Sequence, residues 1–250
     1  MLKILLSGCC GKMGKVVADM IKNSNDSEIV AGIDVVKCDF EFPIYNSINN
    51  FKEKADAIID FSHPSFLSEI LEYAKTTKTP LVIATTGLSS LQIDEINEVA
   101  KVVPIFFCAN MSIGVNLLIE LVKKCANVLG DGFDIEIIEK HHNQKIDSPS
   151  GTALMIADEL SNELPYSTKY SYDRHNQRKK RQNNEIGIHS IRGGTIVGEH
   201  EIIFAGIDEI VSIKHSALSK EIFAVGAIKA AKFIKTKETG LYNMRSMVNQ

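Results

Sequence analysis

An α/β fold is predicted for this chain of 250 residues, with a parallel sheet in its first half and a mixed or antiparallel sheet later. Short apolar runs alternate with segments of helical period up to about residue 110. A long amphipathic segment follows, and then three consecutive strand-like runs separated by glycine-rich or acidic turns. Strands that alternate with helices predict parallel pairing through right-handed crossovers, whereas strands that directly follow one another favour antiparallel pairing.

The elements expected in the first half come in regular order. The strands are short and apolar, as is typical of strands buried on both faces, and cover 2–7, 27–34, 55–62, 80–87 and 104–110. The helices between them carry apolar residues at helical spacing and cover 12–23, 64–77 and 90–102.

The second half begins with SIGVNLLIELVKKCANVLG, a long amphipathic helix that Gly130 would end. FDIEIIEKHH alternates in part like a half-buried strand, and another helix begins near Thr152. KYSYDRHNQRKKRQNN is polar and basic and is expected to be a loop. The strand-like runs IGIHSIRGG, TIVGEHEIIFAG and DEIVSIKHSA come next, and a final helical segment could return to cover the first domain.

Composition excludes several classes of protein. Apolar residues make up 44% of the chain, and the net charge of −3 gives no support for bulk binding to nucleic acid or membrane. The basic stretch 174–181 has little aromatic interleaving, so a solvated loop is favoured there over a nucleic-acid patch. No apolar run is long enough to span a bilayer, and MLKILLSG lacks a signal-peptide pattern. The five cysteines are irregularly spaced, which favours reduced thiols in a cytoplasmic protein over a disulfide frame or a metal site.

A glycine turn follows the first expected strand. Gly8, Gly11 and Gly14 form G-x-x-G-x-x-G, which differs by one position from the usual dinucleotide fingerprint. A plain tight turn explains the glycines alone, but a strand precedes them, a helix follows, and Asp34 ends the next strand. A carboxylate there would accept hydrogen bonds from ribose hydroxyls and repel a 2′-phosphate, which favours NADH over NADPH. Lys37 nearby would soften that preference and allow both cofactors. The first domain is therefore expected to be Rossmann-like and to bind a dinucleotide.

Small polar residues also follow two other strands, in IDFSHP (59–64) and ATTG (84–87). Ligands of open α/β sheets bind beyond the carboxyl ends of the strands, so Thr85, Thr86 and Gly87 are candidates for the nicotinamide ribose region. Helix capping by serine or threonine is nearly as good an explanation of these residues.

The segment EKHHNQKIDSPSGTA predicts a site for an anion that also receives a proton. Ser150, Gly151 and Thr152 stand at the start of a helix, where free N–H groups and the macrodipole favour a negative ligand. Lys145 adds a full positive charge, and a histidine can transfer a proton near neutral pH. His-His-x-x-Lys is poor metal spacing, and Pro-Ser-Gly-Thr lacks the elbow of a serine nucleophile, so both alternatives are disfavoured.

His141 and His142 would point to opposite faces if the strand continued through both. One of them could then donate a proton while the other binds or orients the ligand. A turn at this point would remove that argument.

Several motifs together resemble the dihydrodipicolinate reductase family over nearly the whole chain. They are GCCGKMG, ATTG, CANMSIGVN, HHNQKIDSPSGTA, IRGGTIVGEHEIIFAG and FAVGAIKAAKFI with GLYNM. The resemblance implies a dinucleotide-binding domain of residues 1–110 and 221–250. It also implies an inserted α+β domain of residues 111–220 that binds the substrate, carries a mixed sheet and builds a homotetramer.

The family's activity is the NAD(P)H-dependent reduction of 4-hydroxy-tetrahydrodipicolinate, a cyclic dicarboxylate, to tetrahydrodipicolinate with loss of water. The resemblance implies that His141 is the general acid, that Lys145 assists it, and that His142, Ser150, Gly151 and Thr152 bind the substrate. The candidate cofactor residues are Gly8, Cys10, Gly11, Lys12, Met13, Gly14, Asp34, Phe61, Ser62, Ala84, Thr85, Thr86, Gly87, Ala109, Asn110 and Met111.

Two other functions are alternatives to this one. Another two-domain nicotinamide-dependent dehydrogenase would need different acid–base groups from the HH-x-x-K block. A dinucleotide-sensing module without turnover would not need His141 and Lys145. The adjacent Cys9 and Cys10 in the cofactor turn suggest, in addition, that thiol modification would block NADH binding.

Overall fold

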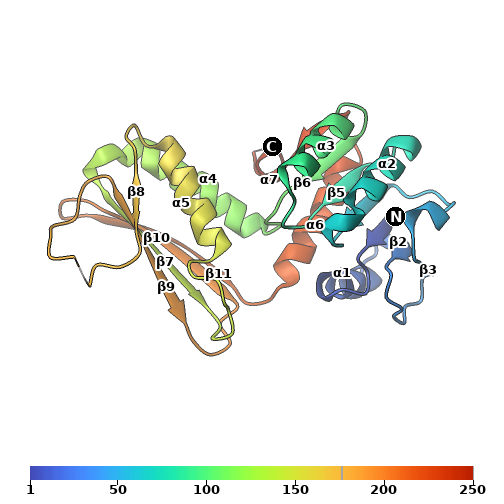
Figure 1. The fold of residues 1–250 in the computed structure, drawn as a ribbon, viewed down its shortest axis with the longest axis horizontal. Coiled ribbons are helices and arrows are strands. Elements are labelled where there is room, and N and C mark those ends of the chain that lie inside the picture. The colour runs from blue at the N-terminus through green and yellow to red at the C-terminus, as the bar shows by residue number, and fades with distance from the viewer. Residues whose placement is uncertain (176, 250) are drawn as a thin grey trace. The chain divides into compact units, whose positions relative to one another are not determined.

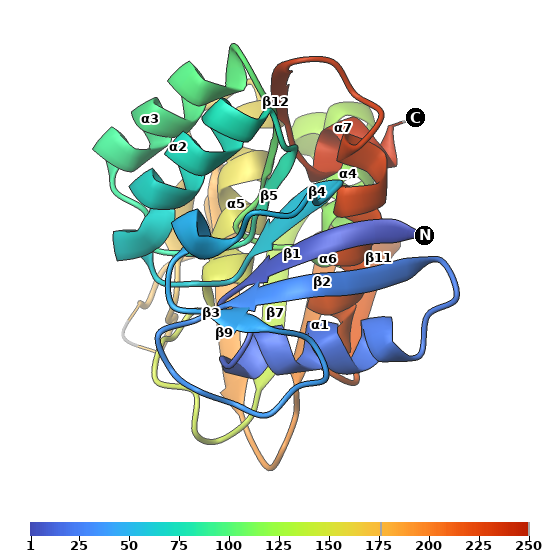
Figure 2. The same cartoon turned by 90° about the vertical axis from the view of Figure 1, so that its right-hand side faces the viewer.

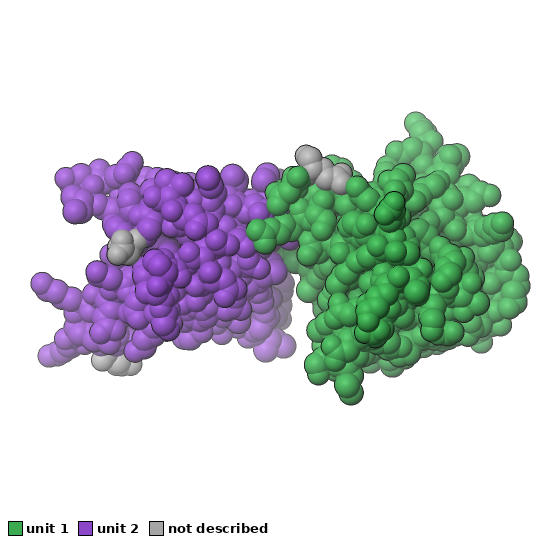
Figure 3. Space-filling model, turned by 90° about the horizontal axis from the view of Figure 1, so that it is seen from above, with its two compact units in different colours: residues 1–113, 221–250 green, residues 114–220 purple. Residues whose placement is uncertain are grey.

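The computed structural model describes residues 1–175 and 177–249 (Figure 1). The chain divides into two compact units, which are coloured separately in Figure 3. Unit 1 contains Met1–Ile113 and Glu221–Gln250, and unit 2 contains Gly114–Lys220.

A seven-stranded sheet forms the centre of unit 1, and its pairings are all parallel between the residues described. The strands are β1 (Leu2–Ser7), β2 (Ser27–Ile33), β3 (Ile44–Tyr45), β4 (Ala57–Asp60), β5 (Leu81–Ile83), β6 (Pro104–Phe107) and β12 (Gly240–Tyr242). Their order is β12-β6-β5-β4-β1-β2-β3. The chain leaves β1 in one direction for β2 and later returns to the other side for β4, so the order reverses at β1, where ligands of such sheets bind.

Helices cover both faces of this sheet (Figure 2). One core joins α1 (Lys12–Lys22) and α6 (Glu221–Ile234) to the sheet, and a second core joins α2 (Leu67–Thr77) and α3 (Ser90–Ala100) to the opposite face. Strands covered on both sides must be apolar throughout, which explains why β4 is buried at every position. Short elements complete the unit: α7 (Met244–Val248) and the 3₁₀ turns Ile48–Asn50 and Pro64–Phe66.

Unit 2 is built on a five-stranded mixed sheet in the order β11-β10-β7-β9-β8. Its elements are α4 (Ile113–Leu129), a 3₁₀ turn (Gly130–Gly132), β7 (Asp134–His141), α5 (Gly151–Glu163), β8 (Lys169–Ser171), β9 (Glu185–Arg192), β10 (Gly198–Ala205) and β11 (Ile210–Ala217). β7 pairs in parallel with β9 and antiparallel with β10.

The two helices of unit 2 pack on one face of its sheet. Ile135 and Ile137 of β7 are buried in the same core as Ile156 of α5, because alternate residues of a strand share a face. The buried Lys123 of α4 ties the helices together through an ion pair of 2.7 Å with Glu159. The same alternation places Glu139 and His141, which end β7, on the covered face.

The predicted α/β fold with two kinds of sheet is confirmed. Short elements were missed: β3 and β12 have two and three residues, too few for a recognisable pattern, and exist because a neighbouring strand supplies their hydrogen bonds. The predicted basic loop was wrong at Lys169–Ser171, which is β8 and pairs with β9.

The rest of the basic stretch is anchored rather than uniformly solvated. Arg174 pairs with Glu185 at 2.6 Å, and Arg181 reaches Asp134 at 2.7 Å. Asn176, which also belongs to the predicted loop, lies outside the described residues. Within residues 1–175 and 177–249, every helix is too short or too polar to cross a bilayer.

Candidate active site

The turn from β1 into α1 brings the chain unusually close to itself. Gly8 has φ of +74°, and a Cβ there would lie 2.6 Å from the carbonyl oxygen of Phe61. A Cβ on Gly14 would lie 2.1 Å from the carbonyl oxygen of Gly8. Both positions therefore require glycine, the first for its backbone conformation and for space, and the second for helix–turn packing. The turn thus leaves the N-terminus of α1 exposed to a ligand, as a pyrophosphate site requires.

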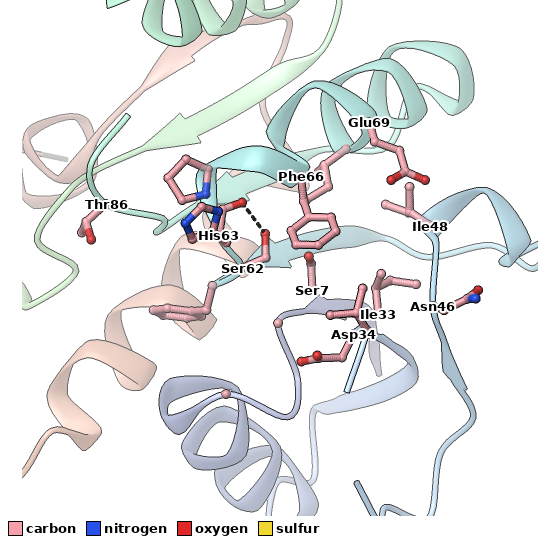
Figure 4. Close-up of a pocket in the computed structure, with 16 residues that line it drawn as sticks. Ser7, Ile33, Asp34, Asn46, Ile48, Ser62, His63, Phe66, Glu69 and Thr86 are labelled. Atoms are coloured by element: carbon pink, nitrogen blue, oxygen red, sulfur yellow. Dashed lines mark hydrogen bonds between the residues drawn. The ribbon is translucent and has the colours of Figure 1, made fainter. Parts of the chain in front are cut away.

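A cavity of about 430 Å³ opens beside this turn, at the carboxyl ends of β1, β2 and β4 (Figure 4). Asp34 and Asn46 lie on one side of the cavity, and Ser62 and His63 lie on another. The Asp34 carboxylate accepts hydrogen bonds from the amides of Cys10 (2.8 Å) and Val36 (2.9 Å). A ribose would find here the acceptor that the sequence predicts.

A second cavity adjoins the ends of β4, β5 and β6. It is lined by Lys12, Met13, Phe61, Ser62, Ala84, Thr85, Thr86, Ala109, Met111 and Phe223. Thr85 donates through its hydroxyl to the buried carboxylate of Asp60 at 2.7 Å, and the amide of Ser62 donates to the same group. Burial raises the pKa of Asp60, while these hydrogen bonds act in the opposite direction. The bonds fix the ends of β4 and β5 relative to each other.

The two cavities share Phe61, Ser62 and Thr86, so most of the predicted cofactor residues form one continuous surface. The helix-capping alternative for Thr85 and Thr86 is wrong, because Ser89 caps α3. Four predicted cofactor residues do not line either cavity: Cys10, Gly14, Gly87 and Asn110. The Asn110 side chain instead accepts from the amide of Ser112.

The expectation that all cysteines are reduced is wrong. Cys10 and Cys38 form a disulfide with a Cα–Cα distance of 5.7 Å. The residues follow the ends of β1 and β2, which are adjacent parallel strands, so the fold brings together two thiols that sequence spacing keeps apart. Cys9 lies beside them as a free, buried thiol, and burial raises its pKa to about 11. The Sγ atoms of Cys9, Cys10 and Cys38 all lie within 4.8 Å of one another.

Sequence reasoning missed part of the surface that lines these two cavities. The additional lining residues near the turn are Ser7, Ile33, Val35, Asn46, Ile48, His63, Pro64, Phe66, Glu69 and Ile70. Half of them, Ser7, Ile33, Val35, His63 and Pro64, end or follow strands already singled out, so the rule that ligands bind at strand ends could have found these. Phe223 could not have been found in this way, because it comes from α6 at the far end of the chain.

In unit 2, His141 is the last residue of β7 and is almost fully buried. Its Nδ1 atom lies 2.6 Å from Oε2 of Glu139, which shares its face of the strand. His142 lies beyond the strand and begins a turn, in which the amide of Lys145 donates to the carbonyl of His142 at 3.1 Å. The argument that the two histidines point to opposite strand faces therefore does not apply, and only His141 is fixed by β7.

Ser150 is the N-cap of α5, and its hydroxyl accepts from the amide of Ala153 at 3.2 Å. The same hydroxyl lies 3.1 Å from Nε2 of His200, a buried residue of β10. Burial and the neighbouring His141 lower the pKa of His200 to about 4, so His200 is neutral near pH 7. The ring centroids of His141 and His200 are 5.3 Å apart. The structure thus brings His141, Ser150 and His200 into one cluster.

Asp147 stands where an anionic ligand is expected. Lys145 Nζ lies 2.8 Å from its Oδ1 atom, and the amide of Gly151 at the start of α5 also donates to it. The Lys145 hydrogen bond is the main cause that lowers the pKa of Asp147. The side chain of Asp147 is 59% exposed, so it can be reached from solvent without opening the core.

Glu139, Arg192 and His200 were missed as site residues. The alternation of β7 could have placed Glu139 beside His141. Arg192 and His200 could not be placed, because they reach the site through strand pairing: Arg192 is opposite His141 in β9, and His200 is opposite Glu139 in β10.

Two family models match the chain. The N-terminal model of dihydrodipicolinate reductase covers residues 2–111, and the C-terminal model covers residues 114–248. A 4-hydroxy-tetrahydrodipicolinate reductase from Caldanaerobacter subterraneus subsp. tengcongensis is 50% identical over 100% of this chain and 99% of its own. One from Clostridium tetani is 49% identical over 100% of this chain and 98% of its own.

Solved structures share the fold. A dipicolinate-bound dihydrodipicolinate reductase from Paenisporosarcina sp. TG-14 has a TM-score of 0.84 at 23% identity and covers 100% of this chain and 99% of its own. A myo-inositol 2-dehydrogenase from Lactobacillus plantarum has a TM-score of 0.61 at 13% identity and covers 93% of this chain and 88% of its own. The resemblance drawn from the sequence motifs is confirmed by the family models and the curated relatives: the chain is an oxidoreductase and belongs to the dihydrodipicolinate reductase family.

Proposed function

We propose that the protein reduces 4-hydroxy-tetrahydrodipicolinate to tetrahydrodipicolinate with NADH or NADPH, and that His141 is the general acid. The reaction adds one hydride to the ring, consumes one proton and releases the hydroxyl group as water. The observation that carries this proposal is the cluster at the end of β7. The end of β7 carries a buried histidine, and the loop that follows places a carboxylate side chain, Asp147, between a lysine and the N-terminus of α5, where a ligand would replace it.

The substrate is a dianion, and the site offers charge for its carboxylates. We propose that one carboxylate takes the place of Asp147 between Lys145 and the amide of Gly151. Thr152 and His142 would complete the grip as further hydrogen-bonding groups. The dipicolinate bound in the Paenisporosarcina structure is itself a ring with two carboxylates, which supports this class of ligand.

The proton would come from His141. Its Nδ1 atom is held by Glu139, so Nε2 is the atom left to serve the substrate. Hydride addition to the conjugated ring places negative charge toward the ring nitrogen, and the ammonium group of Lys145 and the imidazolium of His141 would neutralise it. Ser150 would help to orient the substrate from the end of α5.

The nicotinamide cofactor fits the cavities of unit 1 and would supply the hydride when bound. The fit rests on the close turn at Gly8 and Gly14, which leaves no room for a Cβ, and on the Asp34 carboxylate in the adjoining cavity. Gly11, Lys12 and Met13 at the start of α1 would hold the pyrophosphate. Thr85, Thr86, Ala109 and Met111 would line the nicotinamide end. Asp34 favours NADH, because its negative charge opposes a 2′-phosphate.

We further propose that residues 1–110 and 221–250 act as the cofactor domain, and residues 111–220 as the substrate domain. Hydride transfer then requires the nicotinamide ring held by the first domain to meet the substrate ring held by the second. A homotetramer would form through the sheet face that α4 and α5 leave open, where Ile138 and Ile203 are half-buried. Sedimentation analysis tests the tetramer. We place the enzyme in the cytoplasm, where NAD(P)H is available.

A coupled assay tests the proposed reaction. The product of the preceding synthase reaction is supplied in situ, and absorbance at 340 nm is followed with NADH and with NADPH separately. We expect oxidation of either cofactor only when the cyclic dicarboxylate is present, with higher kcat/KM for NADH. Reduction of NAD⁺ or NADP⁺ with an amino acid or a semialdehyde as substrate instead would identify a different dehydrogenase. Cofactor binding without turnover would identify a sensing module.

A further inference from the structure

One buried carboxylate joins the proton donor to the substrate-binding helix. Glu139 is 0% exposed, and Oε2 lies 2.6 Å from Nδ1 of His141 and 2.8 Å from Nη1 of Arg192. Its Oε1 accepts from Nη2 of Arg192 at 2.7 Å and from the amide of Ser150 at 3.1 Å. Glu139, on β7, is thereby connected to β9 and to Ser150, the N-cap of α5.

We propose that Glu139, clamped by Arg192, is a positioning residue that holds His141 with Nδ1–H toward the carboxylate and Nε2 toward the substrate. The proposal rests on the role of His141 as general acid. In this proposal Glu139 and Arg192 act on His141 without touching the substrate. The single carboxylate of Glu139 sets the position of both the general acid and the anion site at the start of α5.

The carboxylate is ionised although it is buried. Burial acts to raise the pKa of Glu139, but hydrogen bonds from Arg192, His141, Ser190 and Ser150 lower it to about 2. An ionised carboxylate has only acceptors, so the nitrogen of His141 that faces it must carry hydrogen. Charged or titratable groups also face this cluster from other elements: Arg192 on β9, His200 on β10, and Lys145 on the loop after β7.

A glycine lies on the opposite side of the imidazole. A Cβ on Gly198 of β10 would lie 3.1 Å from Nε2 of His141, a tighter approach than ordinary packing allows. Arg192 also donates to the carbonyl oxygen of Asp147 at 2.7 Å, so the clamp reaches the loop that carries Lys145. The same guanidinium therefore steadies the acid and the cation of the site.

Glu139→Gln is the informative change because it keeps the shape and removes one acceptor. Arg192 donates to both carboxylate oxygens, so the new NH₂ group loses one Arg192 hydrogen bond in either orientation and faces either His141 or the amide of Ser150. Guanidinium and amide groups can only donate, whereas an imidazole can exchange its tautomer. We expect the NH₂ group to face Nδ1 and drive His141 to the Nε2–H tautomer. The imidazolium would then have no acceptor for its second hydrogen.

Long-range ¹H–¹⁵N NMR of the full-length protein reports the tautomer directly, and steady-state kinetics report its consequence. For Glu139→Gln we expect the His141 signals to change from Nδ1–H to Nε2–H. We also expect kcat to fall on the order of 10²-fold while the KM for NADH stays within twofold. Glu199→Gln is the matched control, because Glu199 lies in the same sheet and pairs with Lys140 and Lys214. It should leave both readouts unchanged.

An unchanged tautomer or an unchanged kcat in Glu139→Gln would overturn the proposal. If this variant fails to fold, Arg192→Lys provides the test, because lysine keeps the charge but cannot bind both carboxylate oxygens as a fork. We expect a fall of about tenfold in kcat with NADH binding intact, and wild-type kcat would overturn the clamp. His141→Ala distinguishes failure of the proposed function from failure of this positioning role. Wild-type turnover in His141→Ala would remove the general acid of the proposed function. The tautomer of His141 in Glu139→Gln tests the positioning itself.

Discussion

The amide of Cys10 donates a 2.8 Å hydrogen bond to Oδ2 of Asp34, so the cofactor turn and the expected ribose acceptor are directly joined. The second carboxylate oxygen accepts from the amide of Val36 at 2.9 Å. Two backbone groups thus fix the orientation of the carboxylate before any ligand binds. Such preorganisation lowers the entropic cost of binding, and it makes the charge of Asp34 hard to move away from a 2′-phosphate.

Asp34→Asn should shift the cofactor preference toward NADPH. The substitution removes a negative charge next to the expected 2′ position while it keeps the shape. We expect the ratio of kcat/KM for NADPH to that for NADH to rise about tenfold or more. Steady-state assays with both cofactors measure the ratio. Asp39→Asn, at an exposed acid of the same segment, is the control. An unchanged ratio in Asp34→Asn would remove Asp34 from cofactor selection.

Reduction of the Cys10–Cys38 disulfide should weaken NADH binding. The bond ties the glycine turn to the segment whose Val36 amide orients Asp34. Dithiothreitol transfers two electrons and two protons to the disulfide and becomes a cyclic disulfide itself. The freed segment must then be ordered on binding, so we expect Kd for NADH to rise about threefold or more.

Fluorescence titration of NADH, with and without dithiothreitol, measures this effect. Cys38→Ser should show the weaker affinity under both conditions. Alkylation after reduction should label Cys10 and Cys38 and block NADH binding, while Cys9 resists because it is buried and its pKa is raised to about 11. Equal affinity before and after reduction and alkylation would contradict any role of these thiols.

The sequence was most informative where function depends on local backbone. The turn at Gly8 and the helix start at Ser150 are made by consecutive residues, so their geometry could be predicted from spacing alone. Asp34 could be predicted as well, because it follows a strand adjacent in both sequence and sheet.

Sequence reasoning failed where residues meet through pairing of distant strands. Glu139 and Arg192 are separated by 53 positions and meet only because β7 and β9 are neighbours in register. Cys10 and Cys38 likewise meet because β1 and β2 lie side by side. Periodicity predicts that strands exist, but their order in a mixed sheet depends on tertiary packing that one sequence does not display.

His141→Ala should lower kcat by roughly 10²-fold or more, the usual scale for loss of a general acid. NADH affinity should stay nearly unchanged, because His141 belongs to unit 2 whereas the glycine turn and Asp34 belong to unit 1. Stopped-flow turnover and NADH titration separate the two effects. His189→Ala is the control, because His189 lies in the same sheet and pairs with Glu136 instead. Wild-type turnover in His141→Ala would exclude His141 from proton transfer.

Asp147→Asn should strengthen binding of a dicarboxylate. Asp147 competes with the ligand for Lys145 and for the amide of Gly151, and an exposed ion pair of this kind is worth up to about 1 kcal/mol. We expect Kd for dipicolinate to fall by up to about fivefold in a calorimetric titration. Lys145→Ala should instead raise the substrate KM and lower kcat together. Asp158→Asn, on α5 beside Tyr170, is the control and should change neither the Kd for dipicolinate nor the substrate KM and kcat. Weaker dipicolinate binding in Asp147→Asn would show that Asp147 orients Lys145 rather than occupying the ligand site.

His200 should make folding stability depend on pH between about 6.5 and 4. Its pKa is about 4 in the folded protein, against 6.5 when unperturbed, because it is buried and faces His141. Below pH 6.5 the unfolded chain therefore binds a proton that the folded protein rejects, and stability falls as pH drops from 6.5 to 4.

Urea unfolding at several pH values measures this loss, to which His200 should contribute a slope that approaches about 1.4 kcal/mol per pH unit. His200→Gln removes the titrating group and keeps a side chain that can bond to Ser150, so its slope between pH 6.5 and 4 should be lower by nearly that amount. Glu139 has little effect on this comparison, because its pKa of about 2 lies below the ordinary value of 4.5. The folding stability that this shift contributes is therefore lost mainly below pH 4.5. Identical slopes in the wild type and His200→Gln would mean that His200 binds a proton over this pH range in the folded protein as it does in the unfolded chain. The low pKa of His200 would then be contradicted.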